Sequence, residues 1–284
     1  MREVLLDTVM DSVKLVPFLF LTYFVMEWME HHTGEKLQKG IRSAGKSGPL
    51  WGAVLGIMPQ CGFSAAASSL YAGRVITLGT LIAIYLSTSD EMLPIMISEA
   101  VGITMILKVL ATKAVIGMIT GFGIDLAWHL LLKHRDADMD IHKICEQEHC
   151  HCQGGVLGST VKHTLQIFIY IFLISLLING LIQLVGEHTL TGFFSTVPVL
   201  EEFMAGLIGL IPNCASSVVI TQLYLQNVIS GGAMLSGLLV NAGVGVLVLF
   251  RLNKNRKENL AVIGILYAAG VLWGIVAELV GLTF

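Results

Sequence analysis

Two adjacent acidic residues, Asp90 and Glu91, interrupt an apolar stretch that runs from about residue 75 to residue 110. A carboxylate at membrane depth costs about 2.5–3.5 kcal/mol on insertion scales, so acidic residues in such stretches usually serve a function. They can bind a cation, or they can carry the proton of a proton-coupled cycle. The alternative interpretation is an ordinary loop outside the membrane, in which Ser89 or Asp90 caps the following helix.

A proline lies near the middle of two further apolar segments, Pro59 in one and Pro212 in the other. Proline removes a helix hydrogen bond, and lipid offers no partner for the freed backbone groups, so a broken helix needs polar surroundings. The residues at the two prolines carry amide, thiol and hydroxyl groups: Gln60, Cys61, Ser64, Asn213, Cys214, Ser216 and Ser217. One such motif alone would favour a simple kink with close helix packing, whereas two in register favour true breaks.

These residues would provide a mixed set of ligands if they met at the centre of the membrane. Carboxylate, amide and carbonyl oxygens, including those of Asn241 in the second half, suit divalent ions such as Mn²⁺. Two thiolates, Cys61 and Cys214, would shift the preference toward softer metals or arsenic. The expected metal ligands are therefore Asp90, Glu91, Cys61 and Cys214, and the residue types leave hard and soft cargo open.

A third group of potential ligands lies in a polar segment near the middle of the chain. It comprises three cysteines and three histidines within eleven residues: His142, Cys145, His149, Cys150, His151 and Cys152. Their spacing is not that of a structural zinc finger. The segment is either a flexible connector or an accessory loop that collects metal ions, and it cannot itself be the site of transport.

The composition of the chain indicates a membrane protein. Of its 284 residues, 55% are hydrophobic and only 13% are charged, with a mean hydropathy of +0.78, whereas a soluble domain has about 25% charged residues. The net charge of −3 excludes the basic surface on which nucleic-acid binding depends. We expect an all-α polytopic protein whose main partner is the lipid bilayer.

The two halves of the chain repeat each other. Residues 55–86 align without a gap on residues 208–239, and the matches include proline, cysteine, tyrosine and glycine in register. The last helices of the halves also share a tetrapeptide, Ala114–Gly117 and Ala261–Gly264. This duplication predicts about ten transmembrane helices in two repeats, residues 1–132 and 161–284, joined by a linker at 133–160.

Hydropathy places the individual helices and short apolar pieces. The expected order is 13–30, 49–72, 75–88, 93–110 and 112–132 in the first half, and 161–186, 201–225, 228–240, 244–252 and 260–282 in the second. Asp125 and His129 lie four residues apart on one helix face, where a proton relay or an interfacial role could explain them. Glu201, Glu202 and Glu278 are expected at helix ends.

Basic residues in short loops predict the orientation of the chain. Lysine and arginine concentrate in loops 31–48 and 251–258, which places these loops inside and both ends of the chain outside. The linker with its His/Cys residues would then be cytoplasmic. Corresponding segments of the two halves run in opposite directions, so the repeats are expected to be inverted, with broken helices and a substrate site at the midplane.

One stretch of the first half resembles a known family. The residues are Pro59-Gln60-Cys61-Gly62-Phe63-Ser64, then Leu70-Tyr71 and Val75–Leu81, then Leu86-Ser87-Thr88-Ser89-Asp90-Glu91-Met92-Leu93-Pro94. With Pro212-Asn213-Cys214 and the His/Cys loop, the chain is similar over its length to the ten-transmembrane heavy-metal exporters. Members of that family carry names such as arsenic efflux protein or manganese transporter, so the resemblance implies export without fixing the ion.

The expected function is secondary transport of a metal or metalloid ion out of the cytosol, across the cytoplasmic (inner) membrane, by alternating access. Protons are a plausible coupling ion, no cofactor or catalytic residue is expected, and a homodimer is left open. Asp90 and Glu91 would bind the ion, and the lining residues would be Gln60, Cys61, Ser64, Asn213, Cys214, Ser217 and Asn241. The alternatives are a transporter of a small organic solute or organoarsenical, and a membrane enzyme using Asp90 and Glu91 as acid and base.

Overall fold

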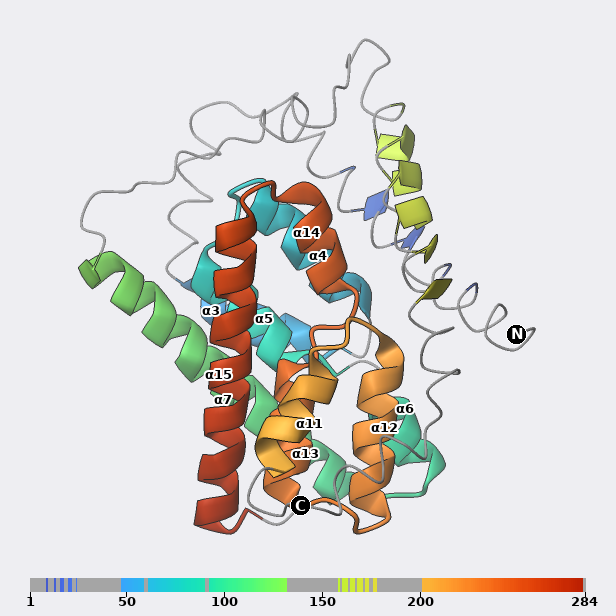
Figure 1. Cartoon of the computed structure of the whole chain (residues 1–284), viewed down its shortest axis with the longest axis vertical. Coiled ribbons are helices and arrows are strands. Elements are labelled where there is room, and N and C mark those ends of the chain that lie inside the picture. Colours follow the sequence, from blue (N-terminus) through green and yellow to red (C-terminus); the bar gives the residue numbers. More distant parts are fainter. Residues whose placement is uncertain are drawn as a thin grey trace.

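The computed structural model describes residues 47–58, 61–89, 92–131 and 201–282, and isolated residues between 9 and 24 and between 158 and 177. All regular structure in these residues is helical (Figure 1). Among the described residues, four helical stretches are long and apolar enough to cross a membrane: Leu78–Ser98, Ile103–Leu130, Gly231–Leu252 and Arg256–Val280. The protein is therefore an integral membrane protein, as its composition predicts.

Five helices of the first half form two interrupted pairs and one long helix. They are α3 (Gly48–Gly56), α4 (Cys61–Ala72), α5 (Leu78–Ser87), α6 (Met92–Ser98) and α7 (Ile103–Leu131). The break expected near Pro59 is confirmed, because α3 ends at Gly56 and α4 begins at Cys61. The Thr77 side chain caps α5 by accepting a hydrogen bond from the Thr80 amide.

The second half has the same order of helices. They are α11 (Glu201–Gly209), α12 (Cys214–Leu225), α13 (Gly231–Val240), α14 (Gly245–Leu252) and α15 (Arg256–Val280). The break near Pro212 is confirmed by the gap between α11 and α12. Glu201 and Glu202 lie in the first turn of α11, where the helix dipole favours acidic residues. Glu278 lies in the last turn of α15, so all three are at helix ends, as expected.

One expected boundary is wrong. The apolar piece near 93–110 is not a single element, because α6 ends at Ser98 and α7 begins at Ile103 rather than near residue 112. Ala100 adopts a left-handed conformation with φ 52°, and the Val101 amide donates to the Met96 carbonyl, which ends α6 in a Schellman-type turn. The residue in this conformation is alanine rather than glycine, so the sequence gives no helix-end signal there.

The same carboxylate contact occurs in both halves. The Gly79 amide at the start of α5 donates to Asp125 Oδ1 at 2.9 Å, and the Gly232 amide at the start of α13 donates to Glu278 Oε2 at 3.0 Å. Each carboxylate of a long helix thus caps the N-terminus of the neighbouring short one. This contact places the Asp125 carboxylate at the start of α5.

The corresponding long helices run in opposite directions. In Figure 1, α7 rises from the lower part of the molecule toward the upper left, whereas α15 descends from top to bottom. Thr120 of α7 and Trp273 of α15 occupy equivalent positions and bond each other, with Trp273 Nε1 donating to Thr120 Oγ1 at 3.0 Å.

The shared tetrapeptide is not in structural register. A Cβ on Gly117 would lie 2.7 Å from the Ala83 carbonyl oxygen, whereas a Cβ on Gly264 would meet nothing within 4 Å. The structural counterpart of Gly117 is Gly270, which faces Ser236 as Gly117 faces Ala83. The tetrapeptide is therefore out of structural register, whereas the register of residues 55–86 and 208–239 continues into α7 and α15.

Close packing of α7 on α5 gives a first testable prediction. We expect Gly117→Ala to lower the free energy of unfolding by about 1–3 kcal/mol, because the new methyl group meets backbone that cannot rotate away. Gly123→Ala is the matched control on the same helix, since a Cβ there meets nothing within 4 Å. Thermal unfolding of the purified variants measures both, and equal melting temperatures would contradict the described packing.

Candidate functional site

A buried lysine of α7 joins the interrupted helices of the two halves. Lys113 is 1% exposed, and its ammonium donates hydrogen bonds to the carbonyl oxygens of Thr88 and Leu238, the latter at 2.9 Å. Thr88 follows the last residue of α5, and Leu238 lies in the last turn of α13. Carbonyls in a last helical turn have no partner within their own helix and carry partial negative charge. One ammonium thus neutralises the C-terminal ends of two helices.

The described residues of the interruption between α5 and α6 are buried. Ser87, Thr88 and Ser89 are at most 2% exposed, and they directly precede Asp90. The Ser87 hydroxyl donates to the Ala83 carbonyl at 2.8 Å, and the Thr88 hydroxyl donates to the Ile84 carbonyl at 2.7 Å. Both hydroxyls therefore bond backbone carbonyls of the preceding helical turn.

The interruption between α13 and α14 is closed by Asn241. This residue is 3% exposed, and its Oδ1 accepts a hydrogen bond from the Gly243 amide at 3.0 Å. Gly243 has a φ of 54°, a left-handed conformation that glycine adopts without steric cost. The Asn241 side chain thus forms a local turn of the kind that asparagine favours.

Helix α4 packs directly against this second interruption. A Cβ on Gly245, the first residue of α14, would lie 2.8 Å from the Cβ and the carbonyl oxygen of Ser64. Ser68 Oγ lies 2.7 Å from the Gly245 carbonyl oxygen and 2.6 Å from the Tyr85 hydroxyl, and all three residues are buried. Ser64 therefore packs against the first residue of α14, which follows the turn that begins at Asn241.

The N-terminus of α12 is polar and buried. Asn213 is its N-cap, with its side chain accepting from the Ala215 amide at 3.5 Å, and Asn213 and Ser217 are 5% and 2% exposed. Cys61 and Cys214 are the first residues of α4 and α12, so both occupy the same place after a break. Helix α12 packs against α6 and α13, as α4 packs against α14 and α5 (Figure 1).

Several expected site residues lie outside the residues that the structure describes. They are Gln60, Asp90, Glu91, and the loop residues His142, Cys145, His149, Cys150, His151 and Cys152. Among the residues that are described, no three His, Cys, Asp or Glu side chains come together as a metal site. The metal-ligand assignments remain predictions from the sequence.

Lys113 is the residue that the sequence interpretation missed. A helix starting near residue 112 places it at a membrane surface, where a lysine needs no special explanation. In the structure α7 starts at Ile103, so Lys113 lies ten residues inside a membrane-spanning helix. A signal for it existed, because an ionisable residue within a continuous apolar run is a functional candidate.

An ion pair joins the two halves at the end of the molecule where α4 ends and α15 begins. The Arg74 guanidinium donates to Glu258 Oε2 at 2.8 Å, and the Tyr71 hydroxyl donates to Glu258 Oε1 at 2.5 Å. Hydrogen bonding to Glu258 raises the pKa of Arg74, so the guanidinium stays charged. Arg74 has a φ of 57°, and its counterpart Asn227 has a φ of 58°, but Asn227 carries no charge.

This difference between Arg74 and Asn227 suggests a test of the ion pair. The substitution Arg74→Asn removes the charge, and asparagine tolerates the left-handed conformation. We expect a double-mutant cycle of Arg74→Asn and Glu258→Gln to give a coupling free energy of about 1 kcal/mol that decreases with salt. Chemical or thermal unfolding of the four proteins measures it. A coupling of zero at low salt would show that the pair does not hold the halves together.

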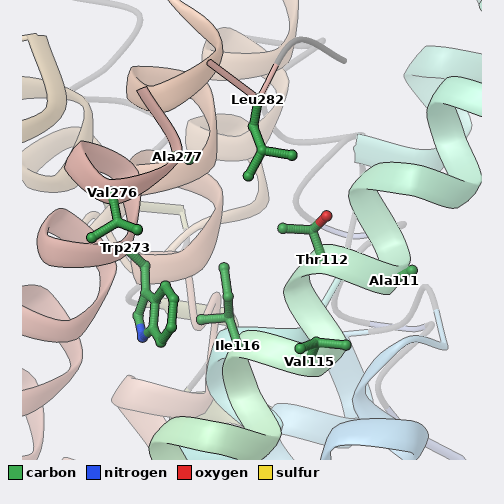
Figure 2. A pocket seen from close by; sticks show the side chains of 8 residues that line it. All are labelled: Ala111, Thr112, Val115, Ile116, Trp273, Val276, Ala277 and Leu282. Atoms are coloured by element: carbon green, nitrogen blue, oxygen red, sulfur yellow. The ribbon is translucent and has the colours of Figure 1, made fainter. Parts of the chain in front are cut away.

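An apolar groove lies between α7 and α15, away from the interruptions. Figure 2 shows its eight lining side chains, and its volume is about 330 Å³. Thr112 supplies the one polar group among side chains that are otherwise hydrocarbon or the Trp273 ring, and Val115 and Val276 are 51% and 43% exposed. Such a surface provides no ligands for an ion, so the polar junction at Lys113 is the better candidate site.

Comparison with known proteins identifies the family of the chain. A family described as "Putative, 10TM heavy-metal exporter" matches residues 1–187 of the chain, which include α3 to α7 and the His/Cys loop. No curated protein and no solved structure matches the chain. The matched part is well over half of the sequence, and it confirms the family resemblance inferred from the motifs of the first half. The chain belongs to this family of ten-transmembrane heavy-metal exporters.

Proposed function

We propose that this protein exports a metal or metalloid ion from the cytosol by alternating access between two inverted repeats. Asp90 and Glu91 bind the ion at the interruption between α5 and α6. The lining residues come from the helix starts and the second interruption: Gln60, Cys61, Ser64, Asn213, Cys214, Ser217 and Asn241. Membership of the exporter family supports the class of cargo.

The observation that carries the proposal is the junction of two interrupted helices at Lys113. Unpaired backbone groups inside a membrane are tolerated only where protein, water or substrate satisfies them. Thr88 and Ser89 are buried immediately before Asp90, which supports a buried carboxylate pair over an ordinary solvent loop. In secondary transporters, such discontinuous helices form the substrate site near the midplane.

Inverted repeats are supported by three features of the helices. The capping contacts of α5 and α13 are equivalent, α7 and α15 run in opposite directions in Figure 1, and Thr120 contacts its counterpart Trp273. Rocking of one repeat against the other would open the site alternately to each side. The basic residues of loop 251–258 support a cytoplasmic position for the end of the molecule at which Arg74 and Glu258 pair.

The balance of thiol and oxygen ligands at the proposed site would determine whether the protein transports a soft or a hard ion. Cys61 and Cys214 begin equivalent helices, so the two sulfurs would enter the site from both repeats. Soft cargo such as arsenite would depend on them, whereas a hard divalent ion such as Mn²⁺ would depend on the carboxylates. Export lost in a Cys61→Ser, Cys214→Ser double variant would identify soft cargo, and retained export would identify hard cargo.

The experiment that tests the proposal measures the elemental content of cells by mass spectrometry. Cells with and without the protein are loaded in turn with Mn²⁺, Zn²⁺, Co²⁺ and arsenite, with the amount of protein in the membrane measured in parallel. The proposal predicts that the content of at least one element falls when the protein is present. Unchanged content of all four at full expression would contradict metal export and favour an organic solute.

A further inference from the structure

The Lys113 ammonium lies at a place that would suit a bound cation. Its ammonium lies where the C-terminal end of α5 and the last turn of α13 converge, and it donates to one carbonyl of each. Half-helix C-termini and unwound carbonyls are the groups with which secondary transporters coordinate Na⁺. The protein thus fills a carbonyl-lined cation position with its own side chain.

We propose that the Lys113 ammonium is a built-in cation that replaces a bound alkali ion at this junction and holds the two interrupted helices in register. The inference deepens the proposed transport function and rests on it for one consequence, which is that cargo movement needs no Na⁺ or K⁺. Lys113 is in this sense a positioning residue, since it fixes the carbonyl of Thr88, two residues before Asp90.

The second half carries no charge at the position equivalent to Lys113. The counterpart of Lys113 is Leu266 of α15, which is completely buried in the apolar core. One repeat therefore supplies an ammonium and the other a hydrocarbon at equivalent places, so the lysine is not a requirement of the fold. Burying an ammonium is costly unless it is bonded to acceptors, and here carbonyls of both halves accept from it.

The test uses thermal unfolding of the purified full-length protein in choline, sodium, potassium and methylammonium chloride at equal ionic strength. We expect the native melting temperature to be the same in all four salts. Lys113→Ala should lower it in choline by about 5 °C or more, because two carbonyls lose their donor. Methylammonium or Na⁺ should restore at least half of that loss by entering the space left by the side chain.

Two further variants isolate the cause. Lys113→Met fills the space without a charge, so we expect a lowered melting temperature with no response to any cation. Lys108→Ala removes an exposed lysine of the same helix and should behave as the native protein in every salt. A Lys113→Ala variant that is as stable as the native protein, or that does not respond to methylammonium, would overturn the proposal.

If Lys113→Ala does not fold, the native protein alone can still test whether the ammonium replaces an alkali ion. A native melting temperature that rises saturably with Na⁺ over choline would mean that an alkali ion binds elsewhere or displaces the lysine, and the built-in cation would be rejected. This unfolding experiment requires no cargo. Its outcome therefore stays separate from the metal-content experiment, which can fail while the cation position is upheld.

Discussion

Asp90→Asn is expected to lower metal export at least about tenfold while the protein still reaches the membrane in normal amount. The substitution retains the size of the side chain and removes one negative charge from the proposed ion site. A tenfold loss corresponds to about 1.4 kcal/mol, which is a modest share of what a buried carboxylate contributes to binding a divalent cation. The time course of metal loss from preloaded cells measures the effect.

Glu99→Gln is the matched control for that variant. Glu99 is an exposed acidic residue just after α6. It has the same charge as Asp90 and lies close to it in the sequence, but unlike residues 87–89 it is not buried. We expect its export rate to equal that of the native protein. Export unchanged in Asp90→Asn, or equally reduced in both variants, would exclude Asp90 as the ion ligand.

Gly245→Ala is expected to lower both the stability of the protein and its transport rate. The new methyl group would lie 2.8 Å from the Cβ and the carbonyl oxygen of Ser64, so α14 must move away from α4. We expect a melting temperature lower by about 5 °C and an export rate reduced by more than half, because the shift reaches the Asn241 turn.

Gly264→Ala is the control for this substitution, since a Cβ at that helical position of α15 meets nothing within 4 Å. Alanine is favoured over glycine inside a helix, so its melting temperature should be equal or slightly raised. Circular dichroism on heating, together with the export assay, separates the two variants. Equal values for Gly245→Ala and Gly264→Ala would mean that α4 and α14 do not approach as closely as described.

Much of the order of the helices can be predicted from the sequence because helix-breaking residues mark where helices end. Pro59 and Pro212 mark two breaks by a local rule that is independent of tertiary packing. The register of the repeat between residues 55–86 and 208–239 is also readable, because rare residue types match in it. The gaps between α3 and α4 and between α11 and α12 agree with these signals.

Other features depend on contacts that no local rule encodes. The end of α6 rests on Ala100 in a left-handed conformation, where glycine or asparagine would have given the signal. The resulting error in the start of α7 hid Lys113, whose partners are 25 and 125 residues away along the chain. The approach of Ser64 to Gly245 likewise joins the two halves and could not be derived from either half alone.

The most direct test of metal export is movement of an ion across a membrane that contains only this protein. Purified native protein is reconstituted into sealed vesicles, and the initial rate of accumulation is measured by mass spectrometry for Mn²⁺, Zn²⁺, Co²⁺ and arsenite, with protein-free vesicles and Asp90→Asn alongside. The account predicts saturable accumulation of at least one of these ions with the native protein, and a rate at least about tenfold lower with Asp90→Asn. Rates equal to those of protein-free vesicles for all four ions, with correctly folded protein present, would contradict it.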